Sequence, residues 1–356
     1  MVRFSRSIFV KLTSAILLAA FFLAGSWVQA ATIVEYVTPT PDSSPAGLAF
    51  DAQGNLWFTE INANKIGKLD PSKAKADTSE GIVEFDLPNP NSQPNDIIVA
   101  RNGMVWFSEM SGNRIGRLDP STGKITEYAI PTPKSEPHNL IEGPEGGIWF
   151  VEFESNKIAR LDPGKGNIEE FSINAGHPHD LVIRDGRIWY SQGGKFWARI
   201  FFNKMGSLDI KTRKVEEIVI PPEKSVPHAV ALAPDGTLWF TQLFANKISK
   251  LEFSENSPPQ IVEYLVPGKR KGPHDLAVDA KRNSIWFTLN RADSIGRLDL
   301  SRAKPGTDQG MEEFKIPTGG SHPNSLTLDS EGNVWFTEMG HYFMGKYHSK
   351  IGKLIP

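Results

Sequence analysis

Runs of alternating apolar and polar residues, each as long as a β-strand, recur along the chain. One stretch shows four of them in succession, at residues 228–233, 237–242, 247–251 and 261–267. The first two are separated by Pro234-Asp235-Gly236, a composition typical of a tight turn. No run has a convincing helical period. The pattern therefore predicts an all-β protein built from short strands joined by turns.

This four-strand unit is repeated along the chain. The phrase Trp-Phe-Thr-Glu recurs with small variations after a short turn, at Trp57, Trp106, Trp149, Trp189, Trp239, Trp286 and Trp335. The spacings are 49, 43, 40, 50, 47 and 49 residues, which suit a four-stranded propeller blade and are too long for leucine-rich or helical repeats. Seven such units predict a single seven-bladed β-propeller.

The two ends of the repeat region indicate how the ring closes. A fourth-strand phrase such as Ile-Val-Glu-Tyr follows each of the first six tryptophans, but the last unit, residues 323–354, lacks it. A seventh copy stands alone at residues 33–36. We therefore expect residues 33–37 to form the outer strand of the last blade, so that no sheet edge stays open.

Two further repeated features have structural interpretations. The periodic Trp and Phe residues are interpreted as core packed between blades, because large aromatic side chains dominate buried area. An Asn precedes Lys or Arg at the turn into most third strands, and it is interpreted as a turn former. These residues are Asn64, Asn113, Asn156, Asn203 and Asn246.

The amino-acid composition excludes several kinds of binding and catalysis. The 356 residues include 39 Lys and Arg, 41 Asp and Glu, 8 His and no Cys, for a formal charge of −2. Such a balance offers no polycationic surface for nucleic acid, so no nucleic-acid partner is expected. The absence of Cys excludes disulfides, zinc-thiolate sites and thiol nucleophiles.

The first 30 residues resemble a signal peptide. Arg3, Arg6 and Lys11 precede an apolar run at residues 16–23, and Val28-Gln29-Ala30 suits signal peptidase. The apolar run is shorter than a bilayer-spanning helix, which needs about 20 residues. We expect cleavage after Ala30, a periplasmic or secreted product without membrane association, and one propeller domain at residues 31–356.

Candidate chemistry gathers where the first strands begin. Each first strand opens with Pro and one variable residue, and four consecutive blades carry His there: His138, His179, His228 and His274. The first strand of a propeller lines the central channel, and its start shares a face with the end of the second strand. Glu60, Glu109, Glu152 and Glu338 fall at that end, so imidazoles and carboxylates are predicted to converge on one mouth of the channel. The alternative is that each His only caps a strand by bonding to the neighbouring blade.

Two long loops between second and third strands are predicted to overhang the same mouth. They contain aromatic and basic residues that would suit an apolar or aryl-bearing, anionic ligand: Phe196, Trp197 and Arg199 in the fourth unit, Tyr342 and Phe343 in the seventh. Packing across the channel is an equally good explanation of these aromatic residues.

The repeat as a whole resembles the streptogramin B lyase (virginiamycin B lyase) family of seven-bladed propellers, and more loosely the NHL-repeat group. Residues 137–162 and 227–251 carry the resemblance well. It implies a magnesium-dependent elimination that opens a cyclic depsipeptide at its ester. The family's catalytic set is a His after Pro in one blade and Glu-Pro-His in the next.

No register of this sequence keeps that set. In chain order the last two blades offer His274 and then His322-Pro323-Asn324. A shift by one blade gives His228 followed by Gly272-Pro273-His274, which keeps both imidazoles, and Glu136-Pro137-His138 is preceded by Asn95. The resemblance therefore favours His228 and His274 as the working pair, with His138 and His179 beside them. Metal-binding carboxylates would have to come from Glu136, Glu109, Glu152 or Asp275.

Three functions stay open from the sequence. One is a metal-assisted carbon-oxygen lyase, the second a propeller that binds a small-molecule or peptide-like ligand without catalysis, and the third a metal-dependent, lactonase-like hydrolase. By resemblance Mg²⁺ is the expected cofactor, no organic cofactor is expected, and the protein is expected to be a monomer.

Overall fold

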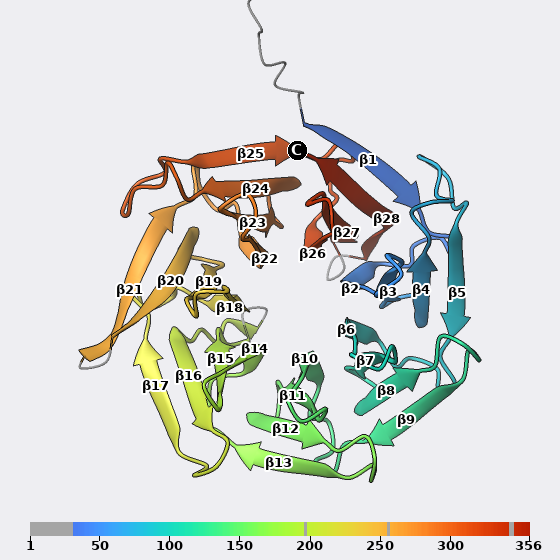
Figure 1. Ribbon diagram of the computed structural model, residues 1–356, viewed down its shortest axis with the longest axis horizontal. Helices are drawn as coiled ribbons and strands as arrows, with labels where there is room; N and C mark the ends of the chain where they lie inside the picture. Colours follow the sequence, from blue (N-terminus) through green and yellow to red (C-terminus); the bar gives the residue numbers. More distant parts are fainter. Residues whose placement is uncertain (1–30, 196–197, 255–256, 342–344) are drawn as a thin grey trace, which may run out of the picture. The chain divides into compact units, whose positions relative to one another are not determined.

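A computed structural model describes residues 31–356 except 196–197, 255–256 and 342–344. Its strands form seven four-stranded antiparallel sheets arranged as blades around a central channel, with the first strand of each blade innermost and the fourth outermost (Figure 1). The predicted seven-bladed β-propeller is thereby confirmed. The proposed signal peptide, residues 1–30, lies outside the described residues. Within the described part of the chain no helix is long and apolar enough to cross a membrane.

The first six blades follow the chain order. Blade one is β2 (Pro45–Phe50), β3 (Leu56–Glu60), β4 (Lys65–Leu69) and β5 (Ile82–Asp86), and blade two is β6 (Pro94–Val99), β7 (Val105–Glu109), β8 (Arg114–Leu118) and β9 (Ile125–Ala129). Blade three is β10 (Pro137–Glu142), β11 (Ile148–Glu152), β12 (Lys157–Leu161) and β13 (Ile168–Ser172), and blade four is β14 (Pro178–Arg184), β15 (Arg187–Gln192), β16 (Lys204–Asp209) and β17 (Val215–Val219). Blade five is β18 (Pro227–Leu232), β19 (Leu238–Gln242), β20 (Lys247–Ser254) and β21 (Ser257–Leu265), and blade six is β22 (Pro273–Asp279), β23 (Ser284–Leu289), β24 (Ser294–Asp299) and β25 (Met311–Lys315).

The seventh blade joins the two ends of the propeller. It consists of β26 (Pro323–Leu328), β27 (Val334–His341), β28 (Lys346–Ile355) and the N-terminal strand β1 (Thr32–Val37). Strand β1 pairs antiparallel with β28, as the missing fourth-strand phrase predicted. Tyr36 of β1 stacks on Trp335 with ring centroids 5.5 Å apart, and Glu35 forms an ion pair of 2.7 Å with Lys350. Closure therefore rests on a ladder, a buried aromatic pair and an ion pair together.

The core lies between the blades. All seven periodic tryptophans are buried, and most stack on the aromatic residue of the fourth strand of their own blade, as Trp57 does on Phe85 and Trp239 on Tyr264. In four blades the phenylalanine after the tryptophan packs over a third-strand glycine, at Gly67, Gly116, Gly296 and Gly352. A Cβ at Gly67, for instance, would lie 2.1 Å from the Phe58 ring, so only glycine fits there. The interpretation of the periodic aromatics as core is confirmed.

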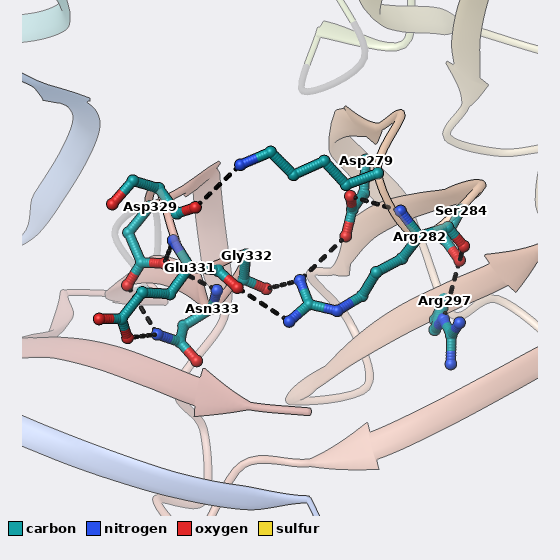
Figure 2. Close-up of polar contacts among 10 residues, drawn as sticks. Asp279, Arg282, Ser284, Arg297, Asp329, Glu331, Gly332 and Asn333 are labelled. Atoms are coloured by element: carbon teal, nitrogen blue, oxygen red, sulfur yellow. Dashed lines mark hydrogen bonds and ion pairs between the residues drawn. The ribbon is translucent and has the colours of Figure 1, made fainter.

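Polar contacts link neighbouring blades at the turns between first and second strands. Arg282 donates to the carbonyl oxygens of Gly332 at 2.8 Å and Glu331 at 2.9 Å in the next blade, and its guanidinium also meets Asp279 at 3.4 Å (Figure 2). These turns follow the ends of the first strands. The starts of the first strands, with the candidate histidines, lie at the opposite face of the ring.

The repeated asparagines hold the segments that deliver the candidate site. Asn64, Asn113, Asn156 and Asn246 have positive φ, which confirms their role as turn formers, whereas Asn203 does not, and its amide donates to the carbonyl oxygen of Ile220 at 3.1 Å. The side-chain oxygen of Asn156 also accepts hydrogen bonds of 2.8 Å from the backbone of Gly176 and His177, directly before Pro178. The residue before each first-strand proline has positive φ too, including Glu136, His177 and His322. Turn and loop are thus tied together just where each Pro-X pair begins.

Candidate functional site

A cavity of about 670 Å³ opens at the mouth of the channel where the first strands begin. Its wall contains three sets of residues at repeated positions. The residue after the first-strand proline contributes Asn95, His138, His179, His228, His274 and Asn324. The residue that follows the second-strand Glu, Gln or Leu contributes Ile61, Met110, Leu243 and Asn290, and the residue before the proline contributes Gln93, Glu136 and His322.

The four predicted histidines form a continuous row along this wall. Ring centroids are 5.9 Å apart for His138 and His179, 4.5 Å for His179 and His228, and 3.9 Å for His228 and His274. Phe153, which the sequence analysis did not single out, stacks on His138 at 4.5 Å and supports this end of the row. The expectation that the four imidazoles share one mouth is confirmed in its geometry.

Backbone carbonyls set the tautomers of the row. His228 Nδ1 lies 3.2 Å from the carbonyl oxygen of His274, and His274 Nδ1 lies 3.0 Å from that of Asn324. Because a carbonyl only accepts, both Nδ1 atoms carry the proton when the rings are neutral, and Nε2 keeps a lone pair. His179 is reversed, since its Nε2 bonds to the carbonyl oxygen of Gly194 at 2.9 Å.

These bonds also bear on the alternative explanation of the histidines. His228 and His274 each bond to the backbone of the next blade, as a strand-capping role requires. The capping interpretation is therefore correct for this pair, but it uses only one ring nitrogen of each. The other nitrogen stays available to a ligand.

Burial keeps the row neutral. Desolvation, with smaller contributions from neighbouring imidazoles, lowers the pKa of His138 to about 3. Desolvation also lowers the pKa of His179 and of His274 to about 4, although a backbone hydrogen bond opposes it in each, and it holds the pKa of His228 well below the usual range. At neutral pH the wall therefore presents neutral imidazoles rather than imidazolium cations.

The predicted second-strand carboxylates do not join this wall. Glu109 and Glu152 are fully buried at the ends of β7 and β11, they do not line the cavity, and Ser155 Oγ donates to Glu152 at 2.6 Å. Desolvation raises the pKa of each to about 7. The expectation that they converge with the imidazoles is wrong, because their side chains pack inside the blade beside the turn that follows the second strand.

Asp275, a predicted metal ligand, instead connects two neighbouring blades. Its carboxylate accepts hydrogen bonds from Ser325 Oγ at 2.6 Å and from the Leu326 amide at 2.9 Å in the next blade. Asp96 and Asp180 accept in the same way from the amides of Leu140 and Val230. A register shift after each first-strand proline frees these amides, and the aspartates of the preceding blade satisfy them. All three carboxylates lie deeper, around a cavity of about 40 Å³ below the imidazoles.

Of the remaining predicted site residues, one lines the cavity, one does not, and four lie outside the described residues. Glu136 lines the cavity, and desolvation followed by the nearby Glu154 raises its pKa. Arg199 is exposed and does not line the cavity. Phe196, Trp197, Tyr342 and Phe343 lie outside the described residues. The end of β27 does contribute Gly340 and His341 to the wall, and the His341 and His322 ring centroids are 4.4 Å apart.

The described residues do not fit Mg²⁺. This ion takes about six oxygen ligands in near-octahedral geometry, whereas the large cavity has imidazoles, amides and, among its described lining residues, Glu136 as its carboxylate. No group of three His, Asp or Glu side chains in the described part of the chain is arranged to hold a metal ion. The imidazoles lie side by side rather than around a common point.

Sequence reasoning missed two sets of lining residues that the repeat itself could have revealed. The apolar residue after each second strand faces the ligand space in several blades, as at Ile61, Met110 and Leu243. One position further on, Ser111, Arg291 and Gly340 line the cavity, and Arg291 is the single basic residue in this register of the repeat.

Fold and site together define a seven-bladed propeller with a ligand cavity lined by neutral imidazoles at one mouth of its channel. The profile of the virginiamycin B lyase family matches residues 24–200 and 192–353, and the chain belongs to this family. It is 28% identical to a virginiamycin B lyase from Staphylococcus aureus, with a TM-score of 0.77 over 92% of this chain and 100% of that one.

Two further comparisons agree. A streptogramin B lyase structure is 30% identical, with a TM-score of 0.77 over 91% of this chain and 97% of that one. A virginiamycin B lyase from Bacillus licheniformis is 45% identical over 40 residues, a match that spans 11% of this chain and 14% of that relative. Another structure of the S. aureus protein is a catalytically inactive histidine-to-alanine variant with quinupristin.

Proposed function

We propose that the chain is an exported carbon-oxygen lyase that opens an ester in a cyclic depsipeptide or a related peptide-like ligand bound at the cavity. The signal-peptide pattern at residues 1–30 supports export. Membership of the virginiamycin B lyase family supports the reaction class.

His274 is the base in this proposal. Its Nε2 takes the proton from the carbon α to a carbonyl, the C–H electron pair becomes a carbon-carbon double bond, and the ester oxygen leaves with its acyl group as a carboxylate. Atoms balance without water, so the ring opens and the mass of the substrate does not change. His228 positions the base, because its Nδ1 bonds to the carbonyl oxygen of His274 at 3.2 Å.

The observation that carries the proposal is the bond from His274 Nδ1 to the carbonyl oxygen of Asn324 at 3.0 Å. It orients the imidazole, and with the pKa of His274 lowered to about 4 the basic nitrogen is unprotonated throughout the neutral range. A base of this kind needs little reorganisation at the moment of reaction.

Bound metal, where a family member uses it, supplies positive charge for an enolate-like intermediate. The residues of this cavity do not fit Mg²⁺, so no step is assigned to it here. Metal assistance thus has no support beyond the family resemblance.

One observation favours the alternative of a binding propeller without catalysis. The last blade carries Asn324 where four others carry His, and its amide donates to the carbonyl oxygen of Ala46 at 3.4 Å. An amide cannot act as a base at neutral pH. If catalysis needs an imidazole in this blade, the cavity only binds its ligand.

The test is incubation of purified residues 31–356 with quinupristin, with and without a chelator, followed by mass spectrometry. Elimination predicts an open-chain product of unchanged mass, separated by chromatography, and the chelator is expected to have no effect. A product heavier by one water would indicate a hydrolase. Binding without any product would support the non-catalytic alternative.

A further inference from the structure

We infer that Arg291 forms an anion-binding subsite on the cavity wall, and that the preferred ligand carries a carboxylate attached to an aromatic or apolar body. This inference deepens the proposed function by naming a ligand class. Its test measures binding and does not require turnover.

Arg291 is the only Lys or Arg among the described residues that line the cavity. It follows β23, and its stem passes over Gly272, where an added Cβ would lie 3.0 Å from the Arg291 Cγ. Glycine before Pro273 therefore leaves room for the arginine to reach across the start of β22, the first strand of its own blade. This places a cation beside the imidazole of His274, whose pKa it helps to lower.

No carboxylate lies within ion-pair distance of this guanidinium in the described part of the chain. Two acidic side chains of the same blade already have other partners. Glu313 pairs with Lys271 at 2.9 Å, and Asp293 accepts from the backbone of Gly320 and His322. Arg270 adds to the positive field, and desolvation together with Arg270 lowers the pKa of Arg291.

An aromatic ring contacts the cation. The Arg291 guanidinium lies 4.5 Å from the centre of the Phe244 ring, and the Phe201 ring is 5.3 Å from Phe244. Lys224 lies 5.7 Å from the centre of the Phe201 ring. A ring that stacks on Arg keeps it extended while its N–H groups stay open to a planar acceptor, for which a carboxylate is the natural partner.

The rest of the wall suits the body of such a ligand. Leu243, Ile61, Met110 and Met339 provide apolar surface, and the neutral imidazoles add flat faces without positive charge. An anion placed elsewhere on the wall would find no cation among the described lining residues. The carboxylate is therefore directed to Arg291 and the apolar body to the centre of the cavity.

The experiment compares 2-naphthoate with 2-naphthamide by isothermal titration calorimetry on purified residues 31–356. The two probes share the naphthyl body, and the carboxylate of one is replaced by a neutral carboxamide in the other. We expect the carboxylate to bind about tenfold more tightly, with a preference that weakens as salt is added. Arg291→Ala should abolish the preference and leave the affinity for the amide unchanged, while Arg291→Lys should retain part of it.

Arg302→Ala is the matched control, because it removes the same charge from an exposed ion pair with Glu312. It should keep the full preference. Equal affinities of the two probes for the unmodified protein, or a preference that survives in Arg291→Ala, would overturn the inference. Since no turnover is measured, an intact preference in a protein that does not open quinupristin would refute only the proposed reaction.

Discussion

His228 Nδ1 donates to the backbone carbonyl of His274 at 3.2 Å, and the two rings lie 3.9 Å apart. The imidazole of blade five thus holds the strand that presents the imidazole of blade six. His274 repeats the relationship toward Asn324 of blade seven. His228 and His274 are therefore both part of the cavity wall and hydrogen-bonded to the backbone of the next blade.

His228→Ala should show this double role. Loss of the bond to His274 leaves the Thr241 hydroxyl, at 3.0 Å, as the remaining side-chain donor to the His274 carbonyl, and we expect the free energy of unfolding to fall by about 1 kcal/mol. Ligand affinity should fall as well, because the His274 backbone, which carries an imidazole of the cavity wall, loses a hydrogen bond that holds it in place. Chemical denaturation and calorimetry measure the two effects. A variant with unchanged stability would mean that the bond does not form in solution.

The rate of ring opening should decline at acid pH, where the His274 imidazole becomes protonated. Its pKa is lowered to about 4, so the unprotonated base is present at neutral pH and is lost only as the pH falls through that value. The rate of ring opening should consequently be flat between roughly pH 6 and 8, in contrast to a solvent-exposed His, which titrates near ~6.5. A limb centred near the ordinary imidazole value would show that His274 is not the base.

The buried glutamates should make the fold sensitive to alkali. Desolvation raises the pKa of Glu338 from 4.5 to about 9, and that of Glu60 to about 8. A raised pKa in the folded state means that stability is complete below the unfolded value and is lost as the pH rises through the folded value. The buried histidines affect stability on the acid side of the pH range. Their pKa values are lowered in the folded protein, so stability is lost as the pH falls below about 6.5.

Glu338→Gln isolates one of these groups, and the chain itself places glutamine at the equivalent Gln192 and Gln242. We expect the variant to lose less stability between pH 6 and 9 than the unmodified protein, by up to about 1.4 kcal/mol per pH unit. Denaturant titration across this range gives the difference. Parallel stability curves for the two proteins would contradict the shifted pKa.

Ring closure predicts a large effect at Tyr36, which is buried against Trp335. Tyr36→Ala should lower the free energy of unfolding by about 3 kcal/mol through lost burial and a cavity beside the tryptophan. Tyr36→Phe should be nearly neutral, since other blades carry Phe85, Phe171 and Phe314 at this position. Equal melting of the alanine variant and the unmodified protein would mean that β1 adds little to the last blade.

The fold could be predicted almost completely, because every blade repeats the same spacing of tryptophan, turn and strand. Even the pairing of β1 with β28 follows from one missing phrase. A repeat fixes the backbone register, and the row of His138, His179, His228 and His274 follows from that register alone.

Side-chain direction was harder to predict. Glu109 and Glu152 occupy the correct end of their strands, but both are fully buried and neither lines the cavity, which Met110 reaches instead of Glu109. Arg291 was overlooked because it breaks the repeat rather than continuing it. The positions at which the sequence departs from its repeat therefore decide which chemical groups distinguish this cavity.

The central claim is that His274 is the base of a carbon-oxygen lyase, and the most direct measurement compares product formation from quinupristin by the unmodified protein, His274→Ala and Arg302→Ala. We predict an open-chain product of unchanged mass from the unmodified protein and from the exposed-site control, and none from His274→Ala, which should still melt as a folded propeller. Product formation at the same rate by His274→Ala, or no product from the unmodified protein, would contradict the account.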